Sequence, residues 1–250
     1  MLWLLTGLAG SRFVPTLKEN LERFSSGGVP YRLVVVENGG GIGCWKGSSD
    51  VLQSKPGVPA FLKVGLDFIR EHAATGDWFA RIDADDYYGS GYLKSIEDMA
   101  SMGATFTGSP SVYVRTEDDH LYYLKSRDSG LKSALGGTLA GLVERAVDFP
   151  DTGKPWGEDT AWVTAMRATR AIGIPREASG YALCRHTGHE HTYPVHGHEF
   201  AHLWPCLPYH LGLWSESRVN GPLRLPERPI LQAPFSAFSA IERLKSAQRD

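Results

Sequence analysis

Apolar strand-like segments alternate with helix-like segments in the first half of the chain, and this feature restricts the possible folds most. Residues 2–8 and 31–37 are apolar runs, and apolar residues at helical spacing fill 14–25 between them. A second helix is expected over 59–74, and a third strand with the sequence WFARID follows it. Such alternation predicts a parallel sheet with helices packed on its faces.

The segments beyond residue 103 predict shorter and more antiparallel strands, and the chain ends in a region of unusual composition. Strand candidates cover 104–109, 111–115 and 119–125, and a helix is expected over about 158–172. Residues 186–210 hold seven of the nine histidines, and the stretch that follows is rich in proline. Because periodicity fades after residue 180, we expect the C-terminal region to wrap around the domain without extending its core.

The whole-chain composition is that of an ordinary globular protein, with 42% hydrophobic and 22% charged residues. A formal net charge of −2 gives no global attraction to nucleic acid or to an anionic membrane. No apolar run is long enough to span a membrane, and the apolar start is too short for a secretory signal and lacks its basic leader. Three widely spaced cysteines favour reduced thiols over a disulfide framework. We therefore expect a cytoplasmic protein.

Polar residues follow the predicted strands at their carboxyl ends. The segment 38–58, rich in glycine, serine and proline, is predicted to be a long loop, and such loops carry ligand contacts in open α/β sheets. Asp83, Asp85 and Asp86 follow the third strand directly. Two carboxylates at i and i+2 can face one divalent cation, and hard oxygen ligands select Mg²⁺ or Mn²⁺, which also bind diphosphate oxygens. The alternative is a solvated turn rich in aspartate.

Two further groups of titratable residues carry alternative interpretations. Glu158 and Asp159 begin a predicted helix, where acids favour the positive end of the helix dipole, but a carboxylate beside a pocket can also act as a general base. The histidines of 186–210 could supply a zinc site, yet neither a cysteine pair with finger spacing nor an HExxH motif accompanies them. One of these histidines could instead join the metal at the aspartate cluster.

Taken in order, six pieces of the sequence resemble family 2 glycosyltransferases, which have the GT-A fold. The pieces span about residues 1–190 and are YRLVVVEN, Lys63-Val64-Gly65-Leu66, GDWFARIDADDYYGSGYL, the Gly136-Gly137 turn, GEDTAWVTAMRATRAIG and YALCRH. The resemblance implies a GT-A-like, Rossmann-like α/β fold with a mostly parallel sheet flanked by helices, a small antiparallel part and a wrapping C-terminal tail. The glycosyltransferase domain would cover 1–185, with a nucleotide-sugar part over about 1–110 and an acceptor part over about 111–185. Residues 186–250 would form a His/Pro-rich extension packed on the same domain.

The resemblance also implies which residues bind the sugar donor. Glu37 stands where the family usually has an aspartate that contacts the nucleotide base or ribose. Lys63 belongs to the same donor-binding part. Asp83, Ala84 and Asp85 occupy the DxD motif, with Asp83 near the ribose and the metal and Asp85 as the direct ligand of Mn²⁺ or Mg²⁺.

The remaining implied roles concern the metal and the transfer step. His186 falls where the family often has a late histidine on the metal or the diphosphate, although His189 or His191 could fill that role. Asp159 is the expected base, and Glu158 is the alternate base or an acceptor-orienting group.

The function implied is the transfer of a sugar from a nucleoside diphosphate donor, with UDP-sugars favoured, to an acceptor hydroxyl with inversion and metal dependence. The acceptor could be a glycan or a hydroxylated base in phage-type DNA, and Trp204 or Trp214 could contribute to an acceptor groove. One alternative is a sugar nucleotidyltransferase, which would release pyrophosphate. Another is a non-catalytic metal-binding or glycan-binding module, suggested by the histidine-rich tail. The sequence leaves the oligomeric state open.

Overall fold

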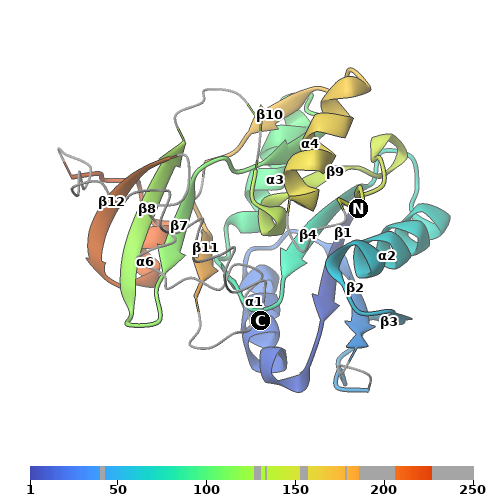
Figure 1. The fold of residues 1–250 in the computed structure, drawn as a ribbon, viewed down its shortest axis with the longest axis horizontal. Helices are drawn as coiled ribbons and strands as arrows, with labels where there is room; N and C mark the ends of the chain where they lie inside the picture. Colours follow the sequence, from blue (N-terminus) through green and yellow to red (C-terminus); the bar gives the residue numbers. More distant parts are fainter. Residues whose placement is uncertain are drawn as a thin grey trace, which may run out of the picture.

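The computed structural model describes residues 1–39, 43–126, 131–132, 134–152, 157–177, 179–185 and 206–226. A seven-stranded sheet forms the centre of the molecule (Figure 1), and its strands β1, β2, β3 and β4 are parallel to one another. In spatial order its strands are β10 (Gly173–Pro175), β6 (Phe106–Gly108), β9 (Ala140–Leu142), β4 (Trp78–Asp83), β1 (Leu2–Leu8), β2 (Tyr31–Asn38) and β3 (Asp50–Ser54). Only β9 is antiparallel to its neighbours, β4 and β6.

A second, five-stranded sheet lies beside the first and is mostly antiparallel (Figure 1). Its strands in spatial order are β12 (Cys206–Leu213), β8 (His120–Ser126), β7 (Val112–Arg115), β11 (Tyr181–Cys184) and β5 (Tyr87–Tyr88). The pair β7 and β11 is its one parallel pair. Strand β5 follows β4 after a short turn. The chain therefore passes from the central sheet to the second sheet at Asp83, Asp85 and Asp86, here called the acidic cluster.

Helices cover both faces of the central sheet because its strands alternate their side chains between two cores. The α-helices are α1 (Val14–Ser26), α2 (Val58–His72), α3 (Tyr92–Ser101), α4 (Glu158–Ala168) and α6 (Glu216–Asn220), and the 3₁₀ turns are η1 (Ser11–Phe13), η3 (Gly136–Thr138) and η4 (Val143–Arg145). Leu4 of β1 packs in one core with α1 and α3. Its neighbour Leu5 packs in the other core with α2 and α4.

Helix α2 approaches β1 very closely, which explains the glycine in the Lys63-Val64-Gly65-Leu66 segment. A Cβ atom on Gly65 would lie 2.1 Å from Leu5 Cδ1. Similarly, a Cβ atom on Gly7 of β1 would lie 2.8 Å from the ring of Phe61 in α2. Larger residues at either glycine would push the helix off the sheet.

The predicted fold class is confirmed, with corrections in two segments. Residues 50–54 form β3, although the whole of 38–58 was expected to be a loop. In the described part of the chain this edge strand pairs with β2 alone. It is half-exposed, so it lacks the apolar run that marks a buried strand. Residues 206–213 form β12 at the edge of the second sheet, although the region was expected to wrap. Pro208, and a bulge between His210 and Gly212, are tolerated there because an edge strand has one unpaired side.

Helix α4 ends at Ala168, four residues before its predicted end. Arg170 follows in the left-handed backbone region with a φ of 62°, which stops the helix before β10 begins.

Two further observations concern the described residues. Cys44 and Cys184 are free thiols. Within the described ranges, no helix is both long enough and apolar enough to cross a membrane.

Candidate functional site

The acidic cluster lies where the carboxyl ends of the parallel strands meet. Asp83 is the last residue of β4, and it pairs in register with Gly7 near the end of β1. Its backbone N–H donates a 2.8 Å hydrogen bond to the Tyr88 hydroxyl, which closes the turn between β4 and β5. Ala84 is buried within this turn. Asp83 and Asp85 thus sit at the edge where open parallel sheets bind ligands.

Asp86 anchors the acidic turn to β11 of the second sheet and to α1. Its carboxylate is 1% exposed and accepts hydrogen bonds from the Tyr181 hydroxyl at 2.6 Å and from the Cys184 N–H at 2.9 Å. Asn20 of α1 donates to the Asp86 carbonyl at 2.8 Å and accepts from the Tyr88 N–H at 3.0 Å. Burial, followed by the nearby charges of Asp85 and Asp83, raises the pKa of Asp86. Asp86 is therefore a structural residue of the turn.

Arg81 joins the acidic cluster at the end of β4 to the pair Glu158 and Asp159 at the start of α4. Its Nε donates to Asp83 Oδ1 at 3.0 Å, and its Nη1 donates to Glu158 Oε1 at 3.0 Å. Only 7% of the Arg81 side chain is exposed, so the guanidinium is a buried charge compensated by carboxylates from two elements. Arg81 is absent from the residues predicted for the site, but a signal was available. It is the one basic residue in the apolar strand WFARID and stands two positions before Asp83, which places both side chains on the same face.

The glycine pair Gly136 and Gly137 in η3 allows the backbone to approach the side chains of Arg81 and Asp83 closely. A Cβ atom on Gly136 would lie 2.5 Å from Arg81 Nη1, and one on Gly137 would lie 3.0 Å from Asp83 Oδ2 and 2.7 Å from the Tyr88 hydroxyl oxygen. The Gly137 carbonyl accepts hydrogen bonds from the hydroxyls of Tyr88 at 2.9 Å and Tyr92 at 3.0 Å. Backbone therefore packs directly against the charged side chains, and a larger residue at either glycine would force Arg81, Tyr88 or Asp83 to shift.

Glu158 and Asp159 begin α4 but have different surroundings. Glu158 is buried and bonded to Arg81. Asp159 is half-buried, and its carboxylate accepts the N–H of Thr160 at 2.6 Å. Burial, followed by the charge of Glu158, raises the pKa of Asp159, while Arg81 opposes this rise. The hydrogen bonds of Arg81 bring Asp83 and Glu158 together, and Asp159 follows Glu158 at the start of α4.

Glu37 lies at the carboxyl end of β2, where both of its carboxylate oxygens hold the following loop. They accept the N–H groups of Gly43 at 2.6 Å and Trp45 at 2.8 Å. Burial acts to raise the pKa of Glu37, but the N–H groups of Trp45 and Gly43 outweigh it and the pKa is lowered. Glu37 thus supports the loop at this sheet edge, and its contact with a nucleotide stays a prediction.

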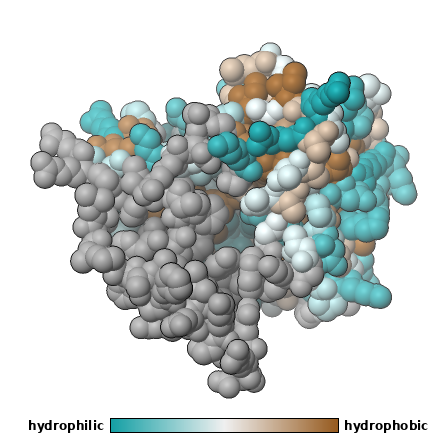
Figure 2. Space-filling view, turned by 45° about the horizontal axis from the view of Figure 1, so that its top comes forward, coloured by the Kyte–Doolittle hydropathy of each residue, from teal (hydrophilic) through white to brown (hydrophobic). Residues whose placement is uncertain are grey.

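Lys63 is not brought to the acidic cluster by its contacts. Its Nζ pairs with Asp67 at 2.8 Å on the outer surface of α2, and 62% of the side chain is exposed. The right-hand side of the face in Figure 2, where α2 lies in Figure 1, is mostly hydrophilic, as expected for such an exposed helix. The surface ion pair accounts for Lys63 without a ligand, so its role toward the donor also stays a prediction.

The metal prediction is tested only in part by the residues present. His186, His189 and His191 lie outside the described residues. Among the residues that are described, no group of three or more His, Cys, Asp or Glu side chains is arranged to hold a metal. Asp83 and Asp85 nevertheless fit a Mg²⁺ or Mn²⁺ ion bound in the usual way for diphosphate substrates, by one or two carboxylates with phosphate and water oxygens as the other ligands.

A cavity of about 370 Å³ opens next to Asp85. It lies between α1, the acidic turn, the turn that joins β7 to β8, the end of β11 and the start of α6. Its lining residues are Thr16, Glu19, Arg23, Asp85, Tyr87, Arg115, Thr116, Glu117, Asp119, Cys184, Arg185, Trp214 and Glu216. Asp85 is thus shared between the acidic cluster and a polar cavity large enough for a small ligand.

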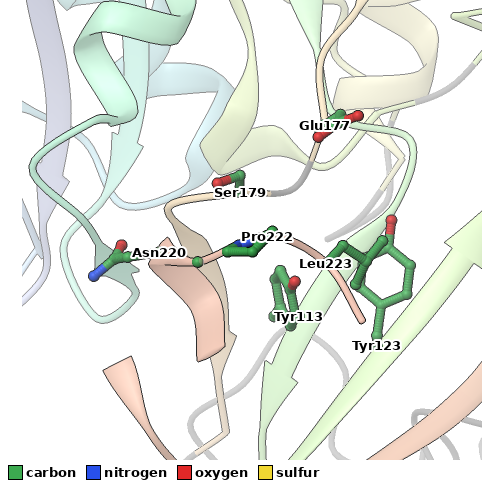
Figure 3. A pocket seen from close by; sticks show the side chains of 8 residues that line it. Tyr113, Tyr123, Glu177, Ser179, Asn220, Pro222 and Leu223 are labelled. Atoms are coloured by element: carbon green, nitrogen blue, oxygen red, sulfur yellow. The ribbon is translucent and has the colours of Figure 1, made fainter. Parts of the chain in front are cut away.

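A smaller cavity of about 190 Å³ lies elsewhere on the second sheet (Figure 3). Figure 3 shows Glu177 and Ser179 above Pro222, with the ring of Tyr113 below it. No residue of the acidic cluster or of α4 lines this second cavity. It is therefore separate from the candidate site.

The two sheets and the acidic turn at the end of a central parallel strand define a GT-A-like fold, which solved structures share. S. aureus TarS 1-349 in complex with UDP-GlcNAc matches with a TM-score of 0.54 and 15% identity over 78% of this chain and 61% of that one. Mannosyltransferase PcManGT from Pyrobaculum calidifontis, in complex with GDP-Man and Mn²⁺, matches with a TM-score of 0.50 and 13% identity over 77% of this chain and 58% of that one. The chain thus spans about 60% of the length of these structures. No protein-family model and no curated protein matches the sequence.

Proposed function

We propose that the protein is a glycosyltransferase of the family 2 type that transfers a sugar from a nucleoside diphosphate donor, a UDP-sugar first among them, to an acceptor hydroxyl. The observation that carries the proposal is the double contact of Arg81, 3.0 Å from Asp83 and 3.0 Å from Glu158. Arg81 thereby joins Asp83, which with Asp85 would suit a metal–diphosphate group, to Glu158, which with Asp159 would suit proton transfer. The likeness in fold to structures with bound UDP-GlcNAc and GDP-Man supports it.

Asp83 and Asp85 would hold Mn²⁺ or Mg²⁺ together with the donor diphosphate, with His186 as a further ligand. Bound there, the ion would stabilise the negative charge that develops on the leaving nucleoside diphosphate. Arg81 keeps the Asp83 carboxylate in a fixed orientation, and Gly137 lets the backbone pack close to it. Glu37, Lys63 and the loop after β2 would contact the nucleotide.

Asp159 would be the general base, and Glu158 would position it through Arg81. The Glu158 carboxylate is hydrogen-bonded to the Arg81 guanidinium. The raised pKa of Asp159, by contrast, makes its carboxylate a better proton acceptor. The acceptor oxygen would attack the anomeric carbon as its proton passes to Asp159. The bond from that carbon to the diphosphate oxygen would break, with its electron pair leaving on the nucleoside diphosphate. One such displacement inverts the anomeric configuration.

The direct test is a product assay with purified protein, Mn²⁺ and a panel of UDP- and GDP-sugars. We expect release of nucleoside diphosphate, through hydrolysis or transfer, and loss of release when Mn²⁺ is chelated. Release of pyrophosphate from a nucleoside triphosphate and a sugar phosphate would instead support a sugar nucleotidyltransferase. Binding of a metal or glycan without any turnover would support a non-catalytic module. A cytoplasmic location stays part of the proposal.

A further inference from the structure

We propose that the smaller cavity on the second sheet binds a protonated alkylamine, a ligand with an ammonium group on an apolar stem (Figure 3). The cavity is separate from the candidate active site, because no residue of the acidic cluster or of α4 lines it. Of the tryptophans expected in an acceptor groove, Trp214 lines the other cavity and Trp204 lies outside the described residues. The lining residues of the smaller cavity are Tyr113, Tyr123, Glu177, Ser179, Asn220, Gly221, Pro222 and Leu223.

The charge of the lining favours a cation. Glu177 is the only charged residue among the described residues that line the cavity, and it has no ion-pair partner in the described part of the chain. In Figure 3 its carboxylate lies at the top of the cavity, and the rings of Tyr113 and Tyr123 lie below it. An anionic ligand would meet an uncompensated negative charge, whereas an ammonium group would neutralise that charge.

The hydroxyl of Tyr113 offers a second polar contact. Tyr113 is 1% exposed, and within the described ranges its hydroxyl makes no hydrogen bond. The hydroxyl oxygen is not fully enclosed, so its remaining exposure opens into the cavity that Tyr113 lines. Burial, followed by Tyr123 and Glu177, raises the pKa of Tyr113 to about 12, so the hydroxyl keeps its proton at neutral pH. An N–H donor in the cavity could therefore bond this oxygen in place of water.

Aromatic and aliphatic side chains suit the apolar stem of such a ligand. The rings of Tyr113 and Tyr123 have their centroids 5.0 Å apart and are tilted by 56°. Ring faces attract a nearby cation, and the rings together with Pro222 and Leu223 would remove methylene groups from water. The cavity measures about 190 Å³, and cavities of about 150 Å³ hold benzene. A butylammonium ion is similar in size to benzene, so it fits the available space.

Hydrogen bonds outside the cavity hold its walls in place. The N–H of Gly180, just before β11, donates to the Val219 carbonyl of α6 at 2.9 Å. Asn220 at the end of α6 donates from its Nδ2 to the Tyr87 hydroxyl at 2.8 Å. The two bonds fix α6 against the segment that enters β11 and against β5. The cavity is therefore formed before a ligand binds, which limits the entropy that binding costs.

The test is an NMR titration of the isotope-labelled whole protein with butylammonium chloride, followed through the amide signals of Glu177, Ser179, Gly221 and Leu223. We expect saturable shifts of these signals. Butanol and butyrate have a similar stem without the positive charge, and they should bind at least about threefold more weakly. Binding of butanol or butyrate as tight as that of butylammonium would overturn the proposal, and so would shifts confined to other residues.

Two variants test the individual contacts. Glu177→Gln should weaken butylammonium binding about threefold or more, because it removes the charge with little change in volume. Glu22→Gln is the matched control, since Glu22 is an exposed carboxylate of α1 that does not line the cavity. Tyr113→Phe should weaken binding about two- to tenfold and leave thermal unfolding unchanged, because the hydroxyl has no hydrogen-bond partner among the residues described. Unchanged affinity in either Glu177→Gln or Tyr113→Phe would contradict the proposal.

Nα-acetyl-lysine amide distinguishes two sources of the same chemical group, because it carries the butylammonium stem on a peptide backbone. Tighter binding than that of butylammonium would identify the lysine side chain of a protein as the ligand, and weaker binding would identify a free amine. Failure of both compounds to bind would overturn the proposal. Because the titration contains neither donor nor metal, that failure would leave the proposed glycosyltransferase function untouched.

Discussion

Nη1 of Arg81 lies 3.0 Å from Oε1 of Glu158, although the two residues are 77 positions apart in the chain. The same guanidinium bonds Asp83, so the end of β4 and the start of α4 share one buried cation. Separate sequence motifs thereby become one site. The proposed mechanism, in which Asp83 helps to hold the donor and Asp159 accepts the acceptor's proton, requires this connection.

Removal of Arg81 should destabilise the fold and abolish transfer together. Arg81→Gln is expected to cost about 3–5 kcal/mol in unfolding free energy, because it leaves buried carboxylates without their cation. Glu158→Gln should cost less, since Asp83 still compensates Arg81. In a double-mutant cycle measured by urea unfolding, the two changes should show a coupling of about 0.5–3 kcal/mol. Strictly additive effects would contradict a direct contact.

Asp159→Asn should separate donor binding from transfer. Donor affinity should be kept, while turnover falls about a hundredfold or more, the effect of losing a general base. In the wild type, turnover should fall as the pH drops through the Asp159 pKa, which is raised above its ordinary value by burial and by Glu158. The Asp159→Asn variant should lose this acid limb in a pH–rate profile. Equal losses of donor affinity and turnover would indicate a structural role at the helix start.

Gly137→Ala should lower turnover, because the added methyl group has no room beside Tyr88 and Asp83. The added methyl would lie 2.7 Å from the Tyr88 hydroxyl oxygen and 3.0 Å from Asp83 Oδ2, so the Asp83 carboxylate must move. A misplacement of about 1 Å in an active site can cost on the order of a hundredfold in rate, so a shift of a few tenths of an ångström should lower turnover roughly tenfold. Gly91→Ala is the matched control, because a Cβ atom there meets nothing within 4 Å and its φ is −81°. Similar rates for both variants would refute the close approach.

Glu37→Gln tests the carboxylate that holds the loop after β2. The amide nitrogen of Gln cannot accept an N–H, so one loop contact is lost, at a cost of about 1–3 kcal/mol in unfolding free energy at pH 7. The pKa of Glu37 is lowered in the folded state, so its stabilisation is present above the unfolded-state pKa and is lost as the pH falls through the folded-state pKa. Chemical unfolding from neutral to acid pH should show the two proteins converging. A difference that does not depend on pH would exclude an ionised Glu37.

The sequence predicted the regular elements of the central sheet well, because their signals are local. The apolar runs of β1 and β2 and the helical spacing of α1 and α2 are the patterns that buried strands and amphipathic helices require. Edge strands carry weaker signals, since β3 and β12 each pair on one side only. The spacing of two residues indicates the contact of Arg81 with Asp83, but the contact of Arg81 with Glu158 and those of Asp86 with Tyr181 and Cys184 join residues more than 75 positions apart, which no local spacing indicates.

The measurement that tests the central claim most directly is calorimetric titration of Asp85→Asn with the best UDP- or GDP-sugar, with and without Mn²⁺. The substitution removes an anionic metal ligand with almost no change in volume, so the fold should persist and metal-dependent affinity should be lost. Asp98→Asn is the control, because Asp98 is an exposed carboxylate in an ion pair on α3, away from the acidic turn. The account predicts Mn²⁺-dependent binding in the wild type and in Asp98→Asn, but none in Asp85→Asn. Undiminished and still metal-dependent binding in Asp85→Asn would contradict it.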